Sequence, residues 1–435
     1  MESAKFLYTS YIVIIIYWIL QGRGGRNPPG PIGLPFIGYY PFMSSKPYLF
    51  LDKLAQTYGP VYSLKLGSQY VVVLNDFLST KDAFFLDAFM GRPPEFSFHL
   101  NKETQNTNAF NGLPWKKQRK FMLHALKGLN FGKSRMENLI KEEITDLMEY
   151  FEKTAGKPTE VGSNLTSSAS SNIAALLFGK RLKYDDPKRV MLNSCLQEAN
   201  KLYSQTSWLL FYPWVVKVMK FLHVGDVGGL FRVYDSMKEY VSIQIKEHEE
   251  TLNETNIRDF IDGYLVEIHK RNDSAFCKPV LEDTAVGLLS AGSETVRLTL
   301  DWLMLTMAAY PDVQEKIQFE IDKVIPRGTL PAWRDRKKLP YIEATIMELM
   351  RWRTIIPLNI LRYTLEDVEF HGYFIPKHAF VLSNLWAIHH NPQYWGEDAE
   401  KFRPERFLTE DGLRIKKSEY FIPFSIARTF SDFSA

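Results

Sequence analysis

The sequence predicts a mainly α-helical fold with a small β part. Three observations support this fold class: a long central region with apolar residues at helical spacing, two β-rich runs near the N-terminus, and more short β-rich runs after the helical region. A chain of 435 residues with 45% hydrophobic content can bury a large core. No repeat or low-complexity block interrupts it, so we expect one large domain.

Charge and cysteine content exclude several classes of protein. With 53 basic and 50 acidic residues and no basic arm, the chain does not fit a nucleic-acid-binding protein. Cys195 and Cys277 are too few for a disulfide framework and lack metal-site spacing, so we interpret both as structural thiols in a reducing compartment. No HExxH or other zinc spacing supports a metallohydrolase.

The composition of residues 1–22 predicts a membrane anchor. They contain the uncharged run FLYTSYIVIIIYWIL, which is shorter than the about 20 residues of a full span. Lys5 and Trp18 would extend it by snorkelling and interfacial anchoring. Arg23 and Arg26 follow and favour a cytoplasmic location for the rest of the chain. A cleaved signal peptide is the alternative, although no small-residue cleavage site follows the run.

The proline and glycine content of residues 23–38 predicts a stiff linker between this anchor and the body at 39–435. The linker contains four prolines and two glycines within nine residues, which is incompatible with helix or regular strand. The β-rich runs 61–66 and 70–74 follow, separated by Gly-Ser-Gln. This pattern predicts a β-hairpin.

Apolar residues at a period of 3.6 predict most of the secondary structure in the centre of the chain. The expected helices cover 115–128, 134–153, 188–204, 229–251, 257–271, 281–309, 312–324 and 340–353. Short strands return at 360–382, and an irregular stretch rich in proline and aromatic residues runs from 391 to 424. The small β part therefore draws on both ends of the sequence.

The longest expected helix, 281–309, contains an unusual segment that reads Ala-Gly-Ser-Glu-Thr at 291–295. A mid-helix glycine costs about 1 kcal/mol relative to alanine, so it usually has a packing or functional reason. Two interpretations stay open. Either a bulky group approaches the backbone at Gly292 while Glu294 and Thr295 relay protons, or the helix packs closely on a neighbour.

Glu348 and Arg351 form a candidate ion pair. They are three residues apart on an expected helix and so lie on one helix face. An exposed pair contributes only tenths of a kcal/mol, whereas a buried pair needs further partners. Arg406 is the candidate third member, because a long coil inside a compact domain is usually functional or held by specific pairs.

Together these segments resemble the cytochrome P-450 family, in its microsomal, animal drug- and steroid-metabolising branch. Ala-Gly-x-Glu-Thr at 291–295, Glu-x-x-Arg at 348–351 and Pro-Glu-Arg-Phe at 404–407 follow the family's order. The Pro-Pro-Gly-Pro linker and Arg-Asp-Phe-Ile-Asp at 258–262 fit that branch. The resemblance covers residues 6–426, and its motifs are jointly specific although each is weak alone.

The resemblance implies a haem b cofactor, electrons from NADPH through a reductase-type partner, and an apolar small-molecule substrate. Gly292 would leave room for oxygen at the iron, and Thr295 with Glu294 would deliver protons. The family's variable substrate-contact regions correspond to 94–113, 196–225 and 355–361, which are rich in apolar and aromatic residues. The other implied residues are the haem contacts Trp115, Arg119, Arg362 and Phe424, and a buried structural triad of Glu348, Arg351 and Arg406.

The family pattern breaks in the haem-ligand loop. The family motif Phe-x-x-Gly-x-Arg-x-Cys-x-Gly corresponds here to 424–433, FSIARTFSDF. Phe424 fits, but Ser431 stands at the position of the ligating cysteine. A thiolate donates electron density that favours O–O cleavage, whereas a serine hydroxyl stays protonated and is a poor iron ligand. We therefore expect no metal ligand here, and an incomplete P-450 haem domain without its C-terminal helix and closing strands.

Two hypotheses follow for the function. The motifs are intact up to Ile426 and all fail afterwards, which favours a transcript or gene-prediction boundary near 427–429 in a monooxygenase lineage, with this chain as written inactive. The alternative is a noncatalytic truncated membrane isoform that binds apolar ligands or the reductase. In both cases we expect the endoplasmic reticulum membrane, with the body facing the cytoplasm.

Two further features have competing interpretations. His389 and His390 would be alternative haem ligands, but adjacent side chains point in different directions and the resemblance places them away from the iron. A basic stretch would either face an acidic redox partner or be a solvated helix face. Its members are Lys116, Lys117, Arg119, Lys120, Lys127 and Lys133.

Overall fold

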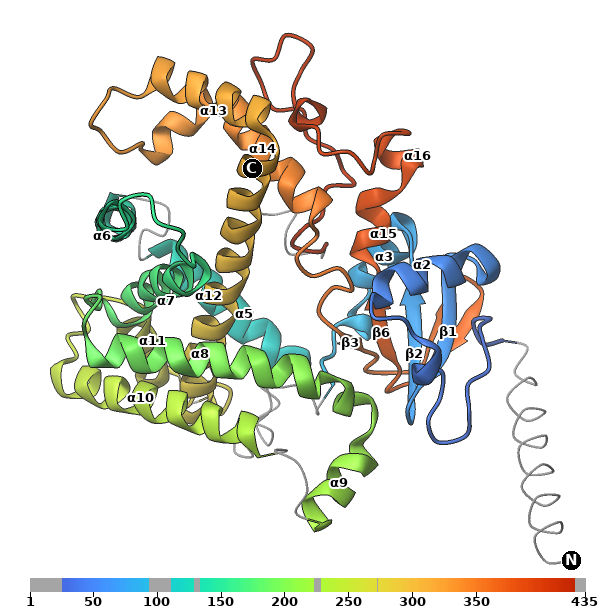
Figure 1. Ribbon diagram of the computed structural model, residues 1–435. Coiled ribbons are helices and arrows are strands. Elements are labelled where there is room, and N and C mark those ends of the chain that lie inside the picture. The colour runs from blue at the N-terminus through green and yellow to red at the C-terminus, as the bar shows by residue number, and fades with distance from the viewer. Residues whose placement is uncertain (1–25, 94–110, 129–133, 223–227, 272, 427–435) are drawn as a thin grey trace, which may run out of the picture.

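The computed structural model describes residues 26–93, 111–128, 134–222, 228–271 and 273–426. The protein is mainly helical with a small β part, which confirms the predicted fold class. Figure 1 shows a helical region and a β region on opposite sides of the long helix α12 (Lys278–Ala309).

The remaining α-helices and the β-strands have the following bounds. The helices are α2 (Pro47–Tyr58), α3 (Phe77–Phe85), α5 (Gly112–Gly128), α6 (Ser134–Lys153), α7 (Gly162–Phe178), α8 (Pro187–Thr206), α9 (Pro213–Leu222), α10 (Gly229–Thr251), α11 (Phe260–Lys270), α13 (Pro311–Val324), α14 (Pro340–Trp352), α15 (Leu385–His390) and α16 (Pro392–Trp395). The strands are β1 (Val61–Leu66), β2 (Gln69–Leu74), β3 (Arg362–Tyr363), β4 (Val368–Phe370), β5 (Tyr373–Ile375) and β6 (Phe380–Ser383).

The larger sheet combines strands from both ends of the sequence, as expected. Its strand order is β1-β2-β6-β3. The predicted hairpin is the antiparallel pair β1–β2, and β6 adds in parallel to β2 with Val71 opposite Phe380. Val71, Val72, Val73 and Leu74 are each 0% exposed. An unbroken apolar run of this kind is typical of a strand covered on both faces.

The Pro- and Gly-rich segment is attached to the body from residue 26 onward, where the Arg26 carbonyl accepts a hydrogen bond from the Phe374 amide at 2.7 Å. The carbonyls of Pro28 and Pro29 accept hydrogen bonds from the hydroxyl and the amide of Ser63, at 2.8 and 2.7 Å. A Cβ at Gly30 would lie 1.6 Å from the Ser63 carbonyl oxygen, so only glycine allows this approach. Within the described residues no helix is long and apolar enough to cross a membrane. The expected anchor at 1–22 lies outside them.

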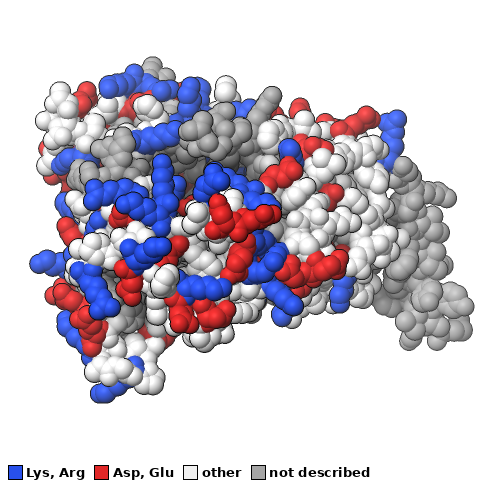
Figure 2. Space-filling model, turned by 90° about the horizontal axis from the view of Figure 1, so that it is seen from above, with Lys and Arg blue, Asp and Glu red and all other residues white. Residues whose placement is uncertain are grey.

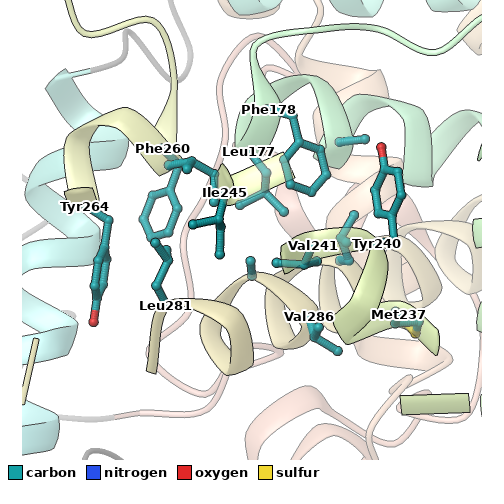
Figure 3. Close-up of a cluster of buried hydrophobic side chains, with 14 of the residues drawn as sticks. Leu177, Phe178, Met237, Tyr240, Val241, Ile245, Phe260, Tyr264, Leu281 and Val286 are labelled. Atoms are coloured by element: carbon teal, nitrogen blue, oxygen red, sulfur yellow. The ribbon is translucent and has the colours of Figure 1, made fainter. Parts of the chain in front are cut away.

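The main hydrophobic core lies between α7, α8, α10, α11 and α12 (Figure 3). The rings of Phe178 and Tyr240 meet edge to face with centroids 5.6 Å apart, which joins α7 to α10. The side chains of Cys195 and Cys277 pack against this core. Their packing agrees with their interpretation as structural residues.

Candidate functional site

Glu348, Arg351 and Arg406 meet in the protein interior. Glu348 and Arg351, both on α14, are 0% exposed. Arg351 donates from Nε to Oε2 and from Nη2 to Oε1 of Glu348, at 2.7 and 2.8 Å. Arg406 Nε lies 3.4 Å from Glu348 Oε1. The bidentate geometry is the strongest form of an arginine–carboxylate pair.

Further hydrogen bonds connect this triad to the coil that follows α16. The Arg403 amide donates to Glu348 Oε1 at 3.0 Å, and Arg406 Nη1 donates to Asp398 Oδ1 at 3.0 Å. Arg351 Nη1 also donates to the carbonyl of His389 at 2.6 Å. A buried ion pair is stable only when its remaining polar atoms are satisfied. The coil and α15 supply these partners, which explains why the coil is ordered although its only helical part is a short 3-10 helix at Pro404–Phe407.

His389 is a structural residue in the interior. It is 0% exposed; its Nδ1 lies 2.9 Å from Thr354 Oγ1, and its Nε2 accepts the Ile422 amide at 3.2 Å. Burial, then the charges of His390 and Arg351, lower the pKa of His389 to about 3. The imidazole is therefore neutral, and the protein's own groups occupy both ring nitrogens.

A cluster of three arginines lies where α5, β3 and the residues after α3 come together. Arg362 is 7% exposed, and its Nε is buried without a hydrogen-bond partner among the described residues. Burial and the charge of Arg119 lower the pKa of Arg362 to about 10. Burial and the charges of Arg362 and Arg119 lower the pKa of Arg92 to about 9. Burial also lowers the pKa of Arg119.

Neighbouring groups fix these three guanidinium groups. Arg119 stacks over the Trp115 ring at 5.3 Å, and Arg362 stacks over Phe84 at 4.4 Å. Arg92 donates from Nη1 to the carbonyls of residues 360 and 361. The Asn111 side chain hydrogen-bonds the amide and carbonyl of Arg92, at 2.6 and 3.2 Å. Because Asn111 directly precedes α5, it aligns the helix that carries Arg119 with Arg92.

Like charges that repel one another inside a protein favour binding of an anion. Three arginines meet here, and the buried Nε of Arg362 has no hydrogen-bond partner among the described residues, so the cluster can accept a further anionic partner. The sequence analysis names Arg119 and Arg362 as expected haem contacts and does not name Arg92. A lone arginine in a coil carries no periodic signal, and only its position beside β3 reveals its role.

The Ala-Gly-Ser-Glu-Thr segment lies in the middle of α12. A Cβ at Gly292 would come within 2.8 Å of the Ile173 side chain on α7, so this glycine permits close helix packing. Thr295 donates to the Ala291 carbonyl at 2.9 Å. Glu294 accepts from Arg297 Nε at 3.0 Å. The packing interpretation of Gly292 is thus supported, and Glu294 has an arginine as its partner in this structure.

The remaining expected site residues lie at the edge of the described chain or beyond it. Phe424 is 69% exposed. The hydroxyl of the next residue, Ser425, accepts a hydrogen bond of 2.8 Å from Asn359. Ser431, at the expected ligand position, lies outside the described residues.

Comparison with known proteins identifies the family of this chain. The cytochrome P450 family profile matches residues 28–428. The chain belongs to the cytochrome P450 family. Cytochrome P450 2J5 of Mus musculus and cytochrome P450 2J2 of Homo sapiens are each 35% identical to it, over 94% of this chain and 82% of those proteins. Cytochrome P450 18a1 of Drosophila melanogaster is 31% identical, over 97% of this chain and 81% of that protein.

Family membership identifies the cofactor as haem, with electrons supplied by a reductase. The arginine cluster fits one part of this cofactor, because haem carries two propionate carboxylates. The donors Arg92, Arg119 and Arg362 are suited to carboxylate recognition. The buried Nε of Arg362, which has no hydrogen-bond partner among the described residues, is the observation that supports this fit.

Part of the basic stretch on α5 is neutralised within the protein. Lys116 pairs with Asp87 and Lys117 with Asp273, both at 2.7 Å. Figure 2 shows basic and acidic side chains interspersed over one face of the molecule. These ion pairs favour the interpretation of a solvated helix face for Lys116 and Lys117. Lys133 lies outside the described residues.

A second buried charge network joins α10 to α11. His248, Asp259 and Asp262 place possible metal-ligand atoms within 4.8 Å of one another. Hydrogen bonds already use these atoms: His248 Nε2 lies 2.8 Å from Asp259 Oδ2, and Asp262 accepts from Arg258 Nε at 2.6 Å. Asp259 also caps α11 by accepting the Asp262 amide at 3.0 Å. We therefore assign this cluster a structural role.

The His248 network predicts a pH-dependent stability. Burial alone would lower the pKa of His248, but the hydrogen bond and charge of Asp259 raise it above its usual value. The stabilisation by the His248–Asp259 pair is complete below pH about 6.5. It is lost as the pH rises through the raised pKa of His248. Replacing His248 with glutamine is expected to lower the free energy of unfolding by about 3 kcal/mol at pH 6 and by less at pH 9.

Urea unfolding between pH 5.5 and 9 measures this difference. The matched control is His269→Gln, because His269 forms an exposed pair with Glu254 at 3.4 Å. Exposed pairs contribute about 0–1 kcal/mol. A His248→Gln deficit that does not change with pH would show that the histidine is neutral.

Proposed function

We propose that the protein derives from haem-thiolate monooxygenases that insert one oxygen atom into an apolar small molecule, and that the chain carrying Ser431 does not form the thiolate-ligated state. The observation that supports the first half of the proposal is the arginine cluster, in which the buried Nε of Arg362 has no hydrogen-bond partner among the described residues. Its guanidinium groups are suited to the carboxylates of the family's cofactor. Serine at the cysteine position supports the second half of the proposal, because the thiolate is the ligand that promotes O–O cleavage.

The residues of this chain would have the following roles. Haem, when bound, supplies oxygen activation. Arg92, Arg119 and Arg362 would hold the propionates, with Trp115 supporting Arg119 by stacking. The hydroxyl of Thr295 would give up its hydrogen bond to the Ala291 carbonyl and would hold a proton for the reacting oxygen.

The carboxylate of Glu294 is partly exposed and paired with Arg297, so it would exchange this proton with solvent. The Glu348, Arg351 and Arg406 triad would keep the adjoining coil in place without contacting the substrate. Gly292 would contribute mainly by letting α12 approach α7.

Residues 1–22 would attach the protein to the endoplasmic reticulum membrane, with the body on the cytoplasmic side beside its reductase. The same anchor fits the alternative, a noncatalytic isoform that binds apolar ligands or the reductase. A cavity between α8, α10 and α12 is compatible with ligand binding in both cases.

The carbon-monoxide difference spectrum of the reduced chain, expressed with Ser431, tests this proposal. We expect no strongly red-shifted Soret band. A red-shifted band would contradict the proposal, because it would require a thiolate at the iron. The variants Cys195→Ser and Cys277→Ser would then show which thiol supplies it. The pyridine haemochrome of the same sample measures separately how much haem the chain retains.

A further inference from the structure

Helix α5 carries two of the expected haem contacts, Trp115 and Arg119. Among the residues of α5, all of which the structure describes, only Gln118 is buried, with 3% of its surface exposed. The apolar side chains that face the main core, such as Phe121, are only partly buried. A glutamine is rarely enclosed to this degree unless its amide group is hydrogen-bonded. Gln118 is therefore the residue at which the protein encloses α5 most completely.

Both polar atoms of the Gln118 amide group are hydrogen-bonded. Its Oε1 accepts from the hydroxyl of Tyr264 on α11 at 2.9 Å, and its Nε2 donates to the carbonyl of Ala275 in the coil before α12. Because a carbonyl only accepts, the second bond fixes the orientation of the amide. Tyr264 belongs to the main hydrophobic core (Figure 3). Burial raises the pKa of Tyr264, so its hydroxyl remains a donor at neutral pH.

The other contacts on this side of α5 hold the helix less precisely. Phe121 meets the rings of Tyr264 and Phe276 edge to face, with centroids 5.2 and 5.6 Å apart. Lys117 forms an ion pair from an exposed position. Apolar burial is non-directional, and an exposed pair contributes little. Hydrogen bonds fix both distance and direction. The amide of Gln118 therefore sets where α5 lies against α11 and the coil before α12.

Arg119 follows Gln118 directly and lies about 100° further around the helix. A rotation or shift of α5 moves the Arg119 guanidinium together with the Trp115 ring, over which it stacks at 5.3 Å. A charge-assisted pair between arginine and carboxylate depends on distance and direction. The position of α5 thus decides how well Arg119 meets a carboxylate.

We propose that Gln118 is a positioning residue for the haem propionate site. It acts through Arg119, by holding α5 to the hydroxyl of Tyr264 and the carbonyl of Ala275. Gln118 itself holds no cofactor atom, because its amide oxygen and nitrogen are used within the protein. This inference rests on the proposed function, which assigns Arg119 to a propionate.

Titration of the haem-free chain with haem, followed by absorbance in the Soret region, tests this role. Gln118→Met keeps the length of the side chain and removes both hydrogen bonds, so it should weaken haem capture about tenfold. Tyr264→Phe removes only one hydroxyl and should weaken capture about threefold. His124→Met is the matched control, because His124 is exposed on the same helix, and it should leave capture unchanged.

Two double variants separate positioning from general stability. Adding Tyr264→Phe to Gln118→Met removes an unpaired buried hydroxyl, so it should recover part of the lost urea midpoint while haem capture stays weak. Arg119→Met alone should weaken capture about tenfold. In that background Gln118→Met should cause no further loss, because it acts through Arg119. A residue that only stabilises the fold would cause the same further loss with or without Arg119.

Unchanged haem capture in both Gln118→Met and Tyr264→Phe, or a full further loss in the Arg119→Met background, would overturn the inference. Circular dichroism establishes that each variant is folded, and if Gln118→Met does not fold, the result for Tyr264→Phe decides. Weakened capture in Arg119→Met with normal capture in Gln118→Met would contradict the inference alone. Normal capture in Arg119→Met would contradict the proposed carboxylate site, and the role of Gln118 with it.

Discussion

Replacing Arg351 with leucine is expected to lower the free energy of unfolding by about 3–5 kcal/mol, because it leaves the buried carboxylate of Glu348 without its bidentate partner. Arg406 stays near Glu348, but at 3.4 Å and with Asp398 as a second partner it compensates only in part. The carbonyl of His389 also loses a donor. The loss is therefore both electrostatic and conformational, since these contacts hold the coil after α16.

The urea midpoint of unfolding measures this loss. Arg414→Leu is the control, because Arg414 is exposed on the same coil. The double variant Arg351→Leu with Glu348→Gln should lose less than the sum of the two single variants, since the pair is coupled. Additive losses, or an Arg351→Leu variant as stable as the control, would show that the pair contributes little to the fold.

Replacing Arg362 with methionine is expected to change stability and cofactor capture in opposite directions. Without haem, Arg362 is a buried charge beside Arg119 and Arg92, so its removal should raise the free energy of unfolding by about 1–2 kcal/mol. The methionine side chain can keep the contact with the Phe84 ring. Haem affinity should fall about tenfold, because one charge-assisted hydrogen bond to a carboxylate is lost.

Urea unfolding of the haem-free chain and titration of the same protein with haem measure these two effects. Arg414→Met should change neither quantity. If Arg362→Met destabilised the haem-free chain and left haem capture unchanged, Arg362 would be a structural residue and the arginine cluster would not be a carboxylate site.

Helices with an amphipathic pattern were predictable from the sequence. The bounds expected for 134–153 and 229–251 agree with α6 and α10. In contrast, α7 was not predicted, because 11 of its 17 residues are buried and four of these are serines. A helix covered on most sides shows no apolar stripe. The hydroxyls that make its sequence look polar bond to α8: Ser170 to Asn193 at 2.7 Å, and Ser167 to Arg189 at 2.8 Å.

Site residues were predictable where local spacing in the sequence brings them together, and not where only the tertiary fold does. The spacing of Glu348 and Arg351 predicted an ion pair, and the long coil that contains Arg406 made this residue the candidate third member. Arg92 gave no signal, because its role comes from the fold that brings residues 91 and 363 together.

The parallel pairing of β2 with β6 has a consequence for synthesis of the protein. Val71 and its partner Phe380 are separated by about 300 residues, and ribosomes add about 5–20 residues per second. The hairpin therefore waits about 15–60 s for its next strand. A two-stranded hairpin is only marginally stable in water, and its unpaired apolar edge attracts other chains. The yield of soluble protein should thus depend on chaperones that shield the Tyr-Val-Val-Val-Leu edge until residue 383 leaves the ribosome.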